Sequence, residues 1–183
     1  AGIKAGMVVA TIADSFSVPE IETRLKITKP ALVFTQDISL RKGKIHALYK
    51  KIIKATETPI ALVSSKTEPL QKRVQDCYWK SFLSKKPDFE SVKMSAEEAM
   101  TILFSSGTTG QPKAIPWNHV TPIKSASDAY YHHDIQKKDV LCWPTNLGWM
   151  MGPWLIFSAF INKASIALYY GAPFQKEFGA FVE

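Results

Sequence analysis

The residues best suited to chemistry form one short polar segment, residues 105–113, which reads Ser-Ser-Gly-Thr-Thr-Gly-Gln-Pro-Lys. Four hydroxyls, two glycines and one lysine fall within it, directly after an apolar run. Glycines let backbone N–H groups approach an anion closely, hydroxyls add hydrogen-bond donors, and the lysine adds a mobile positive charge. The segment therefore predicts a binding site for the phosphate groups of a nucleotide.

Other interpretations of this segment must be weighed. Serine, threonine and glycine also populate ordinary surface turns. A Walker A loop requires a lysine directly after its second glycine, whereas Gln111 and Pro112 separate Gly110 from Lys113. A dinucleotide-binding fingerprint requires three glycines, and Gly107 and Gly110 are the only two in the segment. The segment therefore matches neither of these two common nucleotide motifs.

Residues 102–113, Ile-Leu-Phe-Ser-Ser-Gly-Thr-Thr-Gly-Gln-Pro-Lys, closely resemble the phosphate-binding signature of the AMP-forming acyl-adenylate enzymes. This superfamily includes acyl-CoA synthetases, firefly luciferase and the adenylation domains of peptide synthetases. The likeness runs through all twelve positions and is more specific than a glycine-rich loop alone. One departure follows at once, because Ala114 stands where the family usually has glycine.

Two further regions support the resemblance. Residues 146–152, Asn-Leu-Gly-Trp-Met-Met-Gly, resemble the Asp-x-Gly-Trp-x-x-Gly segment of acetyl-CoA-synthetase-like members, with Asn146 in place of the acid. Residues 5–37 are similar to the region upstream in the same enzymes. The resemblance thus covers about residues 1–173, and it is greatest to the plant peroxisomal acyl-activating enzymes.

The resemblance implies a reaction and assigns residues to it. Family members let a carboxylate attack the α-phosphate of MgATP, which gives an acyl-adenylate and pyrophosphate, and a thiol such as that of coenzyme A then takes the acyl group. Lys113 would be the catalytic residue, since it would neutralise charge on the departing pyrophosphate. The residues that would bind the ATP phosphates are Ser105, Ser106, Gly107, Thr108, Thr109, Gly110 and Lys113.

Trp149, Met150 and Met151 are the candidates for the acyl pocket, although simple core packing explains bulky side chains equally well. A tryptophan beside two flexible methionines limits the depth of a pocket and adapts to shape, which favours a short or medium acid. No residue is predicted as a metal ligand, because the family's Tyr-Gly-x-Thr-Glu segment, which holds adenine and magnesium, does not occur here.

The family's ribose-binding Thr-Gly-Asp and its C-terminal domain with a second lysine are also absent from the sequence. We therefore expect residues 1–183 to be part of the large N-terminal AMP-binding domain of a longer synthetase, and to be inactive alone. The alternative is a non-catalytic nucleotide- or phosphate-binding module that uses the same loop.

The elements that must position these residues follow from periodicity. Short apolar strands alternate with helices, which predicts an α/β fold with layered, largely parallel sheets flanked by helices. A capping box at Ser17 and Glu20 predicts a helix that ends before Pro30. A polar loop at about residues 84–95 divides two α/β portions. The expected strands are 7–12, 31–35, 59–63, 100–104, 139–143 and 164–170, and the other expected helices are 45–53, 74–83, 119–131 and 154–161.

Composition narrows the class of protein. The chain is 46% hydrophobic and 21% charged, which is typical of a globular domain. Residues 1–95 carry 17 basic and 9 acidic residues, and the clustered arginines and exposed aromatic pattern of nucleic-acid-binding modules are lacking. Two distant cysteines argue against a disulfide scaffold and a zinc site. The most apolar stretch is too short to span a membrane. We expect an intracellular protein of the peroxisome or the cytoplasm.

Overall fold

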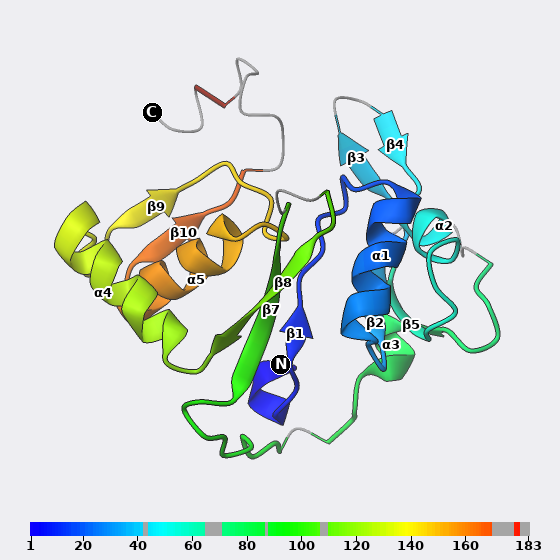
Figure 1. Cartoon of the computed structure of the whole chain (residues 1–183), viewed down its shortest axis with the longest axis horizontal. Coiled ribbons are helices and arrows are strands. Elements are labelled where there is room, and N and C mark those ends of the chain that lie inside the picture. Colours follow the sequence, from blue (N-terminus) through cyan, green and yellow to red (C-terminus); the bar gives the residue numbers. More distant parts are fainter. Residues whose placement is uncertain (42–43, 65–70, 87, 107–109, 170–177, 180–183) are drawn as a thin grey trace. The chain divides into compact units, whose positions relative to one another are not determined.

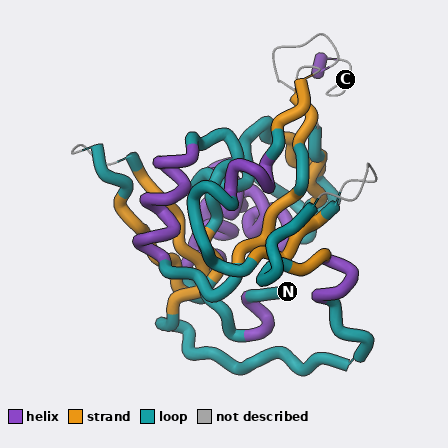
Figure 2. Tube along the Cα trace, turned by 90° about the vertical axis from the view of Figure 1, so that its right-hand side faces the viewer, coloured by secondary structure: helices purple, strands orange, loops and turns teal. Residues whose placement is uncertain are grey.

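The computed structural model describes residues 1–41, 44–64, 71–86, 88–106, 110–169 and 178–179, and the others are drawn in grey in Figures 1 and 2. Gly107, Thr108 and Thr109 of the predicted phosphate segment lie outside the described residues. The chain divides into two compact units. Unit 1 joins Ala1–Ala13 to Ser91–Glu183, and unit 2 is Asp14–Glu90.

The sheet that carries the phosphate segment lies in unit 1. A short 3₁₀ helix, η1 (Ile3–Ala5), leads into β1 (Val9–Ala10), which pairs in parallel with β7 (Ala99–Ser105). β7 pairs on its other side with the antiparallel strand β8 (Lys113–Asn118), so that the strand order is β1-β7-β8 (Figure 1). The strand expected at residues 100–104 is thus confirmed as the centre of this sheet.

Sequence reasoning missed β8. The strand contains Pro116, and a proline lacks the N–H group that a central strand must donate. In the structure Pro116 lies opposite Ile102 on a strand at the edge of this sheet, where one side of the backbone has no partner strand to bond. Four of the six strand pairs described are parallel, and β7–β8 is one of the two antiparallel pairs. The prediction of largely parallel sheets is confirmed.

The remainder of unit 1 is built from two helices and two strands. These are α4 (Thr121–His133), β9 (Val140–Cys142), α5 (Met151–Ile161) and β10 (Ser165–Ala167), and β9 pairs in parallel with β10. The two helices approach closely because Ala129 and Ala159 are fully buried between them and their neighbours. The Ser158 hydroxyl adds a hydrogen bond to the Ser125 carbonyl at 3.2 Å.

Unit 2 has a parallel sheet of its own, with strand order β2-β5-β6. Tyr49, Ile60 and Leu62 form its buried centre. Its elements are α1 (Val18–Thr28), β2 (Val33–Gln36), β3 (Ser39–Arg41), β4 (Lys44–His46), α2 (Leu48–Ile52), β5 (Ile60–Val63), β6 (Cys77–Tyr78) and α3 (Trp79–Phe82).

Helix α1 forms as its capping box predicts. The Glu20 carboxylate accepts the backbone N–H of Ser17 at 2.8 Å and its hydroxyl at 2.6 Å. The helix ends at Thr28, and Lys29 takes the left-handed conformation with φ of 43° just before Pro30. Both ends are therefore determined by local sequence.

Two expected helices in unit 2 were wrong in part. Ile45 belongs to β4, where it pairs with Leu40 and is 69% exposed, so only residues 48–52 are helical. The segment 74–83 begins with the exposed Val74 and then forms β6 and α3. Its course is set by Asp76, whose carboxylate accepts the backbone N–H of Ile60 at 2.9 Å and draws the segment alongside β5.

Among the helices in the described part of the chain, none combines the length and the apolar character of a membrane span.

Candidate functional site

The predicted phosphate segment closes a β-hairpin. Ser105, the last residue of β7, and Lys113, the first of β8, are Cα partners in the antiparallel register. Directly opposed residues of an antiparallel pair project their side chains from the same face of the sheet, with Cβ atoms about 5 Å apart. The hydroxyl of Ser105 and the ammonium group of Lys113 therefore start from neighbouring points on one face, and Lys113 is exposed.

Gly110 has a backbone conformation that favours glycine. Its φ of +78° lies in the left-handed region, which residues with a side chain rarely adopt. A Cβ atom placed there would meet nothing within 4 Å, so glycine is required by the backbone conformation rather than by space. Ser106 and Gly110 are both exposed, and their backbone groups flank the residues 107–109 that lie outside the described part.

This arrangement differs from that of a P-loop, in which a glycine-rich turn leads directly into a helix. Here the segment leads into β8, and the next helix, α4, begins only at Thr121. Within the described residues, the segment therefore does not lead directly into a helix N-terminus, as a P-loop does. The positive charge that the segment itself offers to an anion is that of the Lys113 side chain, with hydrogen bonds from hydroxyls and backbone N–H groups.

The acyl-pocket candidates lie where a tight turn enters α5. The Asn146 side-chain oxygen accepts the backbone N–H of Gly148 at 2.8 Å, and the Asn146 carbonyl accepts that of Trp149 at 3.0 Å. Trp149 is 43% exposed and Met150 is 52% exposed, while Met151 is half-buried. The first two side chains are not enclosed in a core within the described residues, and their role in binding an acid stays a prediction.

The two predicted segments meet the same edge of the β1-β7-β8 sheet. Because β1 and β7 are parallel, the residues after Ala10 and the residues after Ser105 leave the sheet at its carboxyl edge. The backbone of Gly148 packs on Ala13, so that a Cβ atom at Gly148 would lie 2.5 Å from the Ala13 nitrogen. In open α/β sheets, ligands commonly bind outside the carboxyl ends of the strands.

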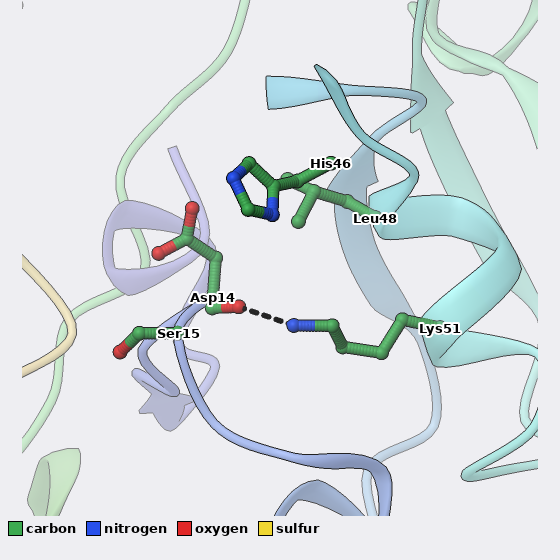
Figure 3. A pocket seen from close by; sticks show the side chains of 5 residues that line it. All are labelled: Asp14, Ser15, His46, Leu48 and Lys51. Atoms are coloured by element: carbon green, nitrogen blue, oxygen red, sulfur yellow. Dashed lines mark hydrogen bonds between the residues drawn. The ribbon is translucent and has the colours of Figure 1, made fainter. Parts of the chain in front are cut away.

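Unit 2 holds a small pocket of about 190 Å³ that sequence reasoning missed, because its residues come from distant segments. In Figure 3 the side chain of Lys51 reaches across from α2 toward the backbone of Asp14, and the side chains of Asp14 and His46 lie on one side of it. The Lys51 ammonium donates to the carbonyls of Asp14 at 2.8 Å and of Phe16 at 3.1 Å. These bonds tie the chain before α1 to α2. The pocket is lined by Asp14, Ser15, His46, Leu48 and Lys51.

A buried polar network in unit 2 also lacked any local signal. The fully buried carboxylate of Asp76 accepts the Tyr49 hydroxyl at 2.6 Å and the Arg73 Nε–H at 2.9 Å. Arg73 also donates to the carbonyls of Thr56 at 2.8 Å and Thr58 at 2.9 Å. These bonds commit Asp76 and Arg73 to joining β5, β6 and α2, which indicates a structural role.

Burial and the hydrogen bonds of this network change the pKa values of Asp76 and Tyr49. Burial raises the pKa of Asp76, but hydrogen bonds from Arg73, Tyr49 and the Ile60 N–H outweigh it and leave the pKa below its ordinary value. Burial, together with the hydrogen bond to Asp76, raises the pKa of the Tyr49 hydroxyl. Within the described ranges, no group of three His, Cys, Asp or Glu residues is placed to hold a metal ion.

A family model described as "AMP-binding enzyme" matches residues 1–183, the whole of the sequence. The chain belongs to the AMP-binding enzyme family. Curated relatives include "Hexanoyl-CoA synthase" of Cannabis sativa, which is 47% identical over 99% of this chain and 26% of its own length. "Probable acyl-activating enzyme 18, peroxisomal" of Arabidopsis thaliana is 48% identical over 99% of this chain and 26% of its own length.

Solved structures agree with this membership of the AMP-binding family. "Acetoacetyl-CoA Synthetase from Streptomyces lividans" has a TM-score of 0.76 at 26% identity, over 92% of this chain and 26% of that one. The luciferase-like enzyme of the mealworm Zophobas morio has a TM-score of 0.73 at 18% identity, over 98% of this chain and 40% of that one, and shows the fold alone. The chain spans about a quarter of the length of the curated relatives named above.

Proposed function

We propose that this AMP-binding family protein is an acyl-CoA synthetase. It activates a carboxylic acid with MgATP to an acyl-adenylate and pyrophosphate, and then transfers the acyl group to the thiol of coenzyme A with release of AMP. The observation that carries the proposal is the pairing of Ser105 with Lys113 across the hairpin that bears the phosphate segment. Residues 1–183 would form part of the large N-terminal AMP-binding domain.

The hairpin suits the charge that develops in the reaction. As the carboxylate attacks the α-phosphorus, the bond to the leaving pyrophosphate breaks and negative charge grows on the β- and γ-phosphate oxygens. Lys113, at the start of β8, supplies positive charge to these oxygens, and a cation held where negative charge develops lowers the barrier. The residues proposed to hold the phosphates are Ser105, Ser106, Gly107, Thr108, Thr109 and Gly110.

The acid would bind against Trp149, Met150 and Met151. Trp149 and Met150 are half-exposed beside the edge of the sheet where the phosphate segment begins, so they are accessible to a substrate. Their bulk favours a short or medium acid, and one relative is named a hexanoyl-CoA synthase. Two relatives carry "peroxisomal" in their names, which favours the peroxisome over the cytoplasm for this protein.

The proposal is tested by ATP–pyrophosphate exchange with the full-length protein. Acids from acetate to palmitate, together with aryl acids, are supplied one at a time, and thioester formation is then measured with coenzyme A. We expect exchange that depends on the acid and is fastest for a short or medium chain. ATP binding without acid-dependent exchange for any acid would instead favour a non-catalytic nucleotide-binding module.

A further inference from the structure

We infer that Gly148 is a positioning residue that sets the distance between the acyl segment, residues 146–152, and the end of β7 at Ser105, where the phosphate segment begins. The inference rests on the proposed function and names a residue that acts on the geometry of the site rather than on the reacting atoms. It is carried by one contact between backbones, the approach of Gly148 to the chain that leaves β1.

The contact leaves no room for a side chain. A Cβ atom at Gly148 would lie 2.5 Å from the nitrogen of Ala13, 2.7 Å from its Cα and 2.7 Å from the carbonyl carbon of Ile12. All three are backbone atoms, so no change of rotamer relieves the overlap. Gly148 does not take a left-handed conformation. Among the described glycines, Gly6 and Gly110 are the two with positive φ. Glycine is thus required at this position by distance alone.

The β1 side of the contact is held firmly. The Thr101 hydroxyl of β7 donates to the Val9 carbonyl at 2.6 Å, and the N–H of Thr11 donates to the Ile102 carbonyl at 3.3 Å. Ala13 itself is only 1% exposed. The chain from Val9 to Thr11 is therefore bonded to the same strand, β7, whose end begins the phosphate segment, and Ala13 follows two residues later.

The acyl segment is compact, and two of its side chains reach the surface. The Asn146 side chain fixes the turn, and a Cβ atom at Gly152 would lie 2.5 Å from the Leu147 Cα, so the turn folds tightly onto the start of α5. Trp149 and Met150 remain half-exposed. Because β1 is hydrogen-bonded to β7, we expect extra volume at Gly148 to displace the acyl segment rather than β1.

A change at Gly148 should affect the binding of the acid and the binding of ATP differently. Under the proposed function, contacts to the ATP phosphates would come from the β7–β8 hairpin, whereas contacts to the acid would come from the segment that Gly148 positions. A shift of about 1 Å in reacting groups costs on the order of 100-fold in rate, because attack requires a separation near 3–3.5 Å. Gly148→Ala should therefore change how the acid binds and leave the binding of ATP nearly unchanged.

The test compares single glycine-to-alanine variants of the full-length protein in the exchange assay. For Gly148→Ala we expect the kcat/KM for the preferred acid to fall by about tenfold or more, the ranking of acids by kcat/KM to change, and the KM for ATP to stay within about twofold. Gly110→Ala, which strains the phosphate segment, should instead raise the KM for ATP and leave the ranking of acids unchanged. Gly2→Ala, whose added Cβ would meet only the Val9 side chain at 3.2 Å, is the folding control.

A KM for ATP that rises as much as the kcat/KM for the acid falls, or an unchanged ranking of acids in a Gly148→Ala variant that unfolds at the wild-type urea midpoint, would overturn the inference. If that variant does not fold, Asn146→Ala loosens the same segment without adding atoms. It must then show the acid-selective change, and a wild-type ranking would again overturn the inference. Exchange by the wild-type protein tests the proposed function separately, so failure of one is distinguishable from failure of the other.

Discussion

Ser105 and Lys113 face each other across the last pair of the β7–β8 ladder, so the predicted phosphate segment begins and ends at one point of the sheet. A ligand held by this segment is bound between two strands whose register is already set by the pairs Leu103–Ile115 and Phe104–Ala114. The lysine is thus placed by the sheet, and only its side chain must adapt to the anion.

Lys113→Ala in the full-length protein should slow acid-dependent ATP–pyrophosphate exchange by about 100- to 1,000-fold, because the leaving pyrophosphate loses a positive charge that would stabilise it. Lys113→Arg should recover part of the rate. The matched control is Lys137→Ala, which removes an exposed lysine outside the hairpin from the same unit. A normal exchange rate in Lys113→Ala would refute the role proposed for this residue.

The Asn146 side-chain oxygen accepts the N–H of Gly148 at 2.8 Å. A carboxylate oxygen can accept the same bond, so Asn146→Asp should keep the wild-type ranking of acids and the KM for the preferred acid within about twofold. Steady-state exchange over the acid series measures both. A tenfold change in that KM would show that the amide does more than hold the turn.

Asp76→Asn should destabilise unit 2 by about 3 kcal/mol, because it removes the charge that compensates the largely buried Arg73. Glu57→Gln is the control, since Glu57 pairs with the same Arg73 at 3.2 Å but its side chain is 88% exposed, and it should cost at most about 0.5 kcal/mol. Urea unfolding gives the free energies, and hydrogen exchange of peptides from β5 locates the effect. Similar losses for the two variants would contradict a buried network.

The Asp76 carboxylate should also make the folding stability depend on pH. Hydrogen bonds hold the pKa of Asp76 below its ordinary value in the folded protein despite burial. Its contribution is therefore complete above the pKa of the unfolded chain and is lost as the pH falls through the lower, folded pKa. Urea unfolding between about pH 6 and 2 should show a loss that is smaller in Asp76→Asn.

At alkaline pH, Tyr49 should make the folding stability fall as the pH rises. Burial raises the pKa of its hydroxyl, with the hydrogen bond to Asp76 adding to the effect. Its contribution is complete below the unfolded pKa and is lost as the pH rises through the higher, folded pKa. Tyr49→Phe should be less stable at neutral pH but should lose less stability between about pH 9 and 12. Parallel pH curves for the two proteins would count against this assignment.

Local signals predicted the parts of the fold that local interactions determine. The capping box at Ser17 and Glu20 located α1, and the apolar run at residues 100–104 located β7, because each is specified by neighbours in sequence. β8 was missed since Pro116 argues against a strand until its edge position is known. Ile45 was assigned to a helix because spacing alone does not show that it pairs with Leu40.

A sequence motif predicted the candidate site, but it did not predict the geometry of that site. The residue types at 105–113 predicted phosphate binding, but nothing in them shows that Lys113 lies opposite Ser105. The approach of Gly148 to Ala13 joins residues far apart in sequence, as does the bond from Tyr49 to Asp76. Such contacts depend on how the strands assemble, which a single sequence without its register does not specify.

The hairpin also restricts which changes of length the phosphate segment can tolerate. Successive side chains of a strand alternate between the two faces of a sheet, so a slip of β8 by one residue would turn Lys113 to the opposite face and put Ala114 opposite Ser105. An insertion of one residue that is absorbed by slippage would thus abolish the charge on the correct face, whereas an insertion of two would restore the parity. When an insertion is absorbed by slippage of β8, the lysine therefore keeps its face of the sheet only if the number of inserted residues is even.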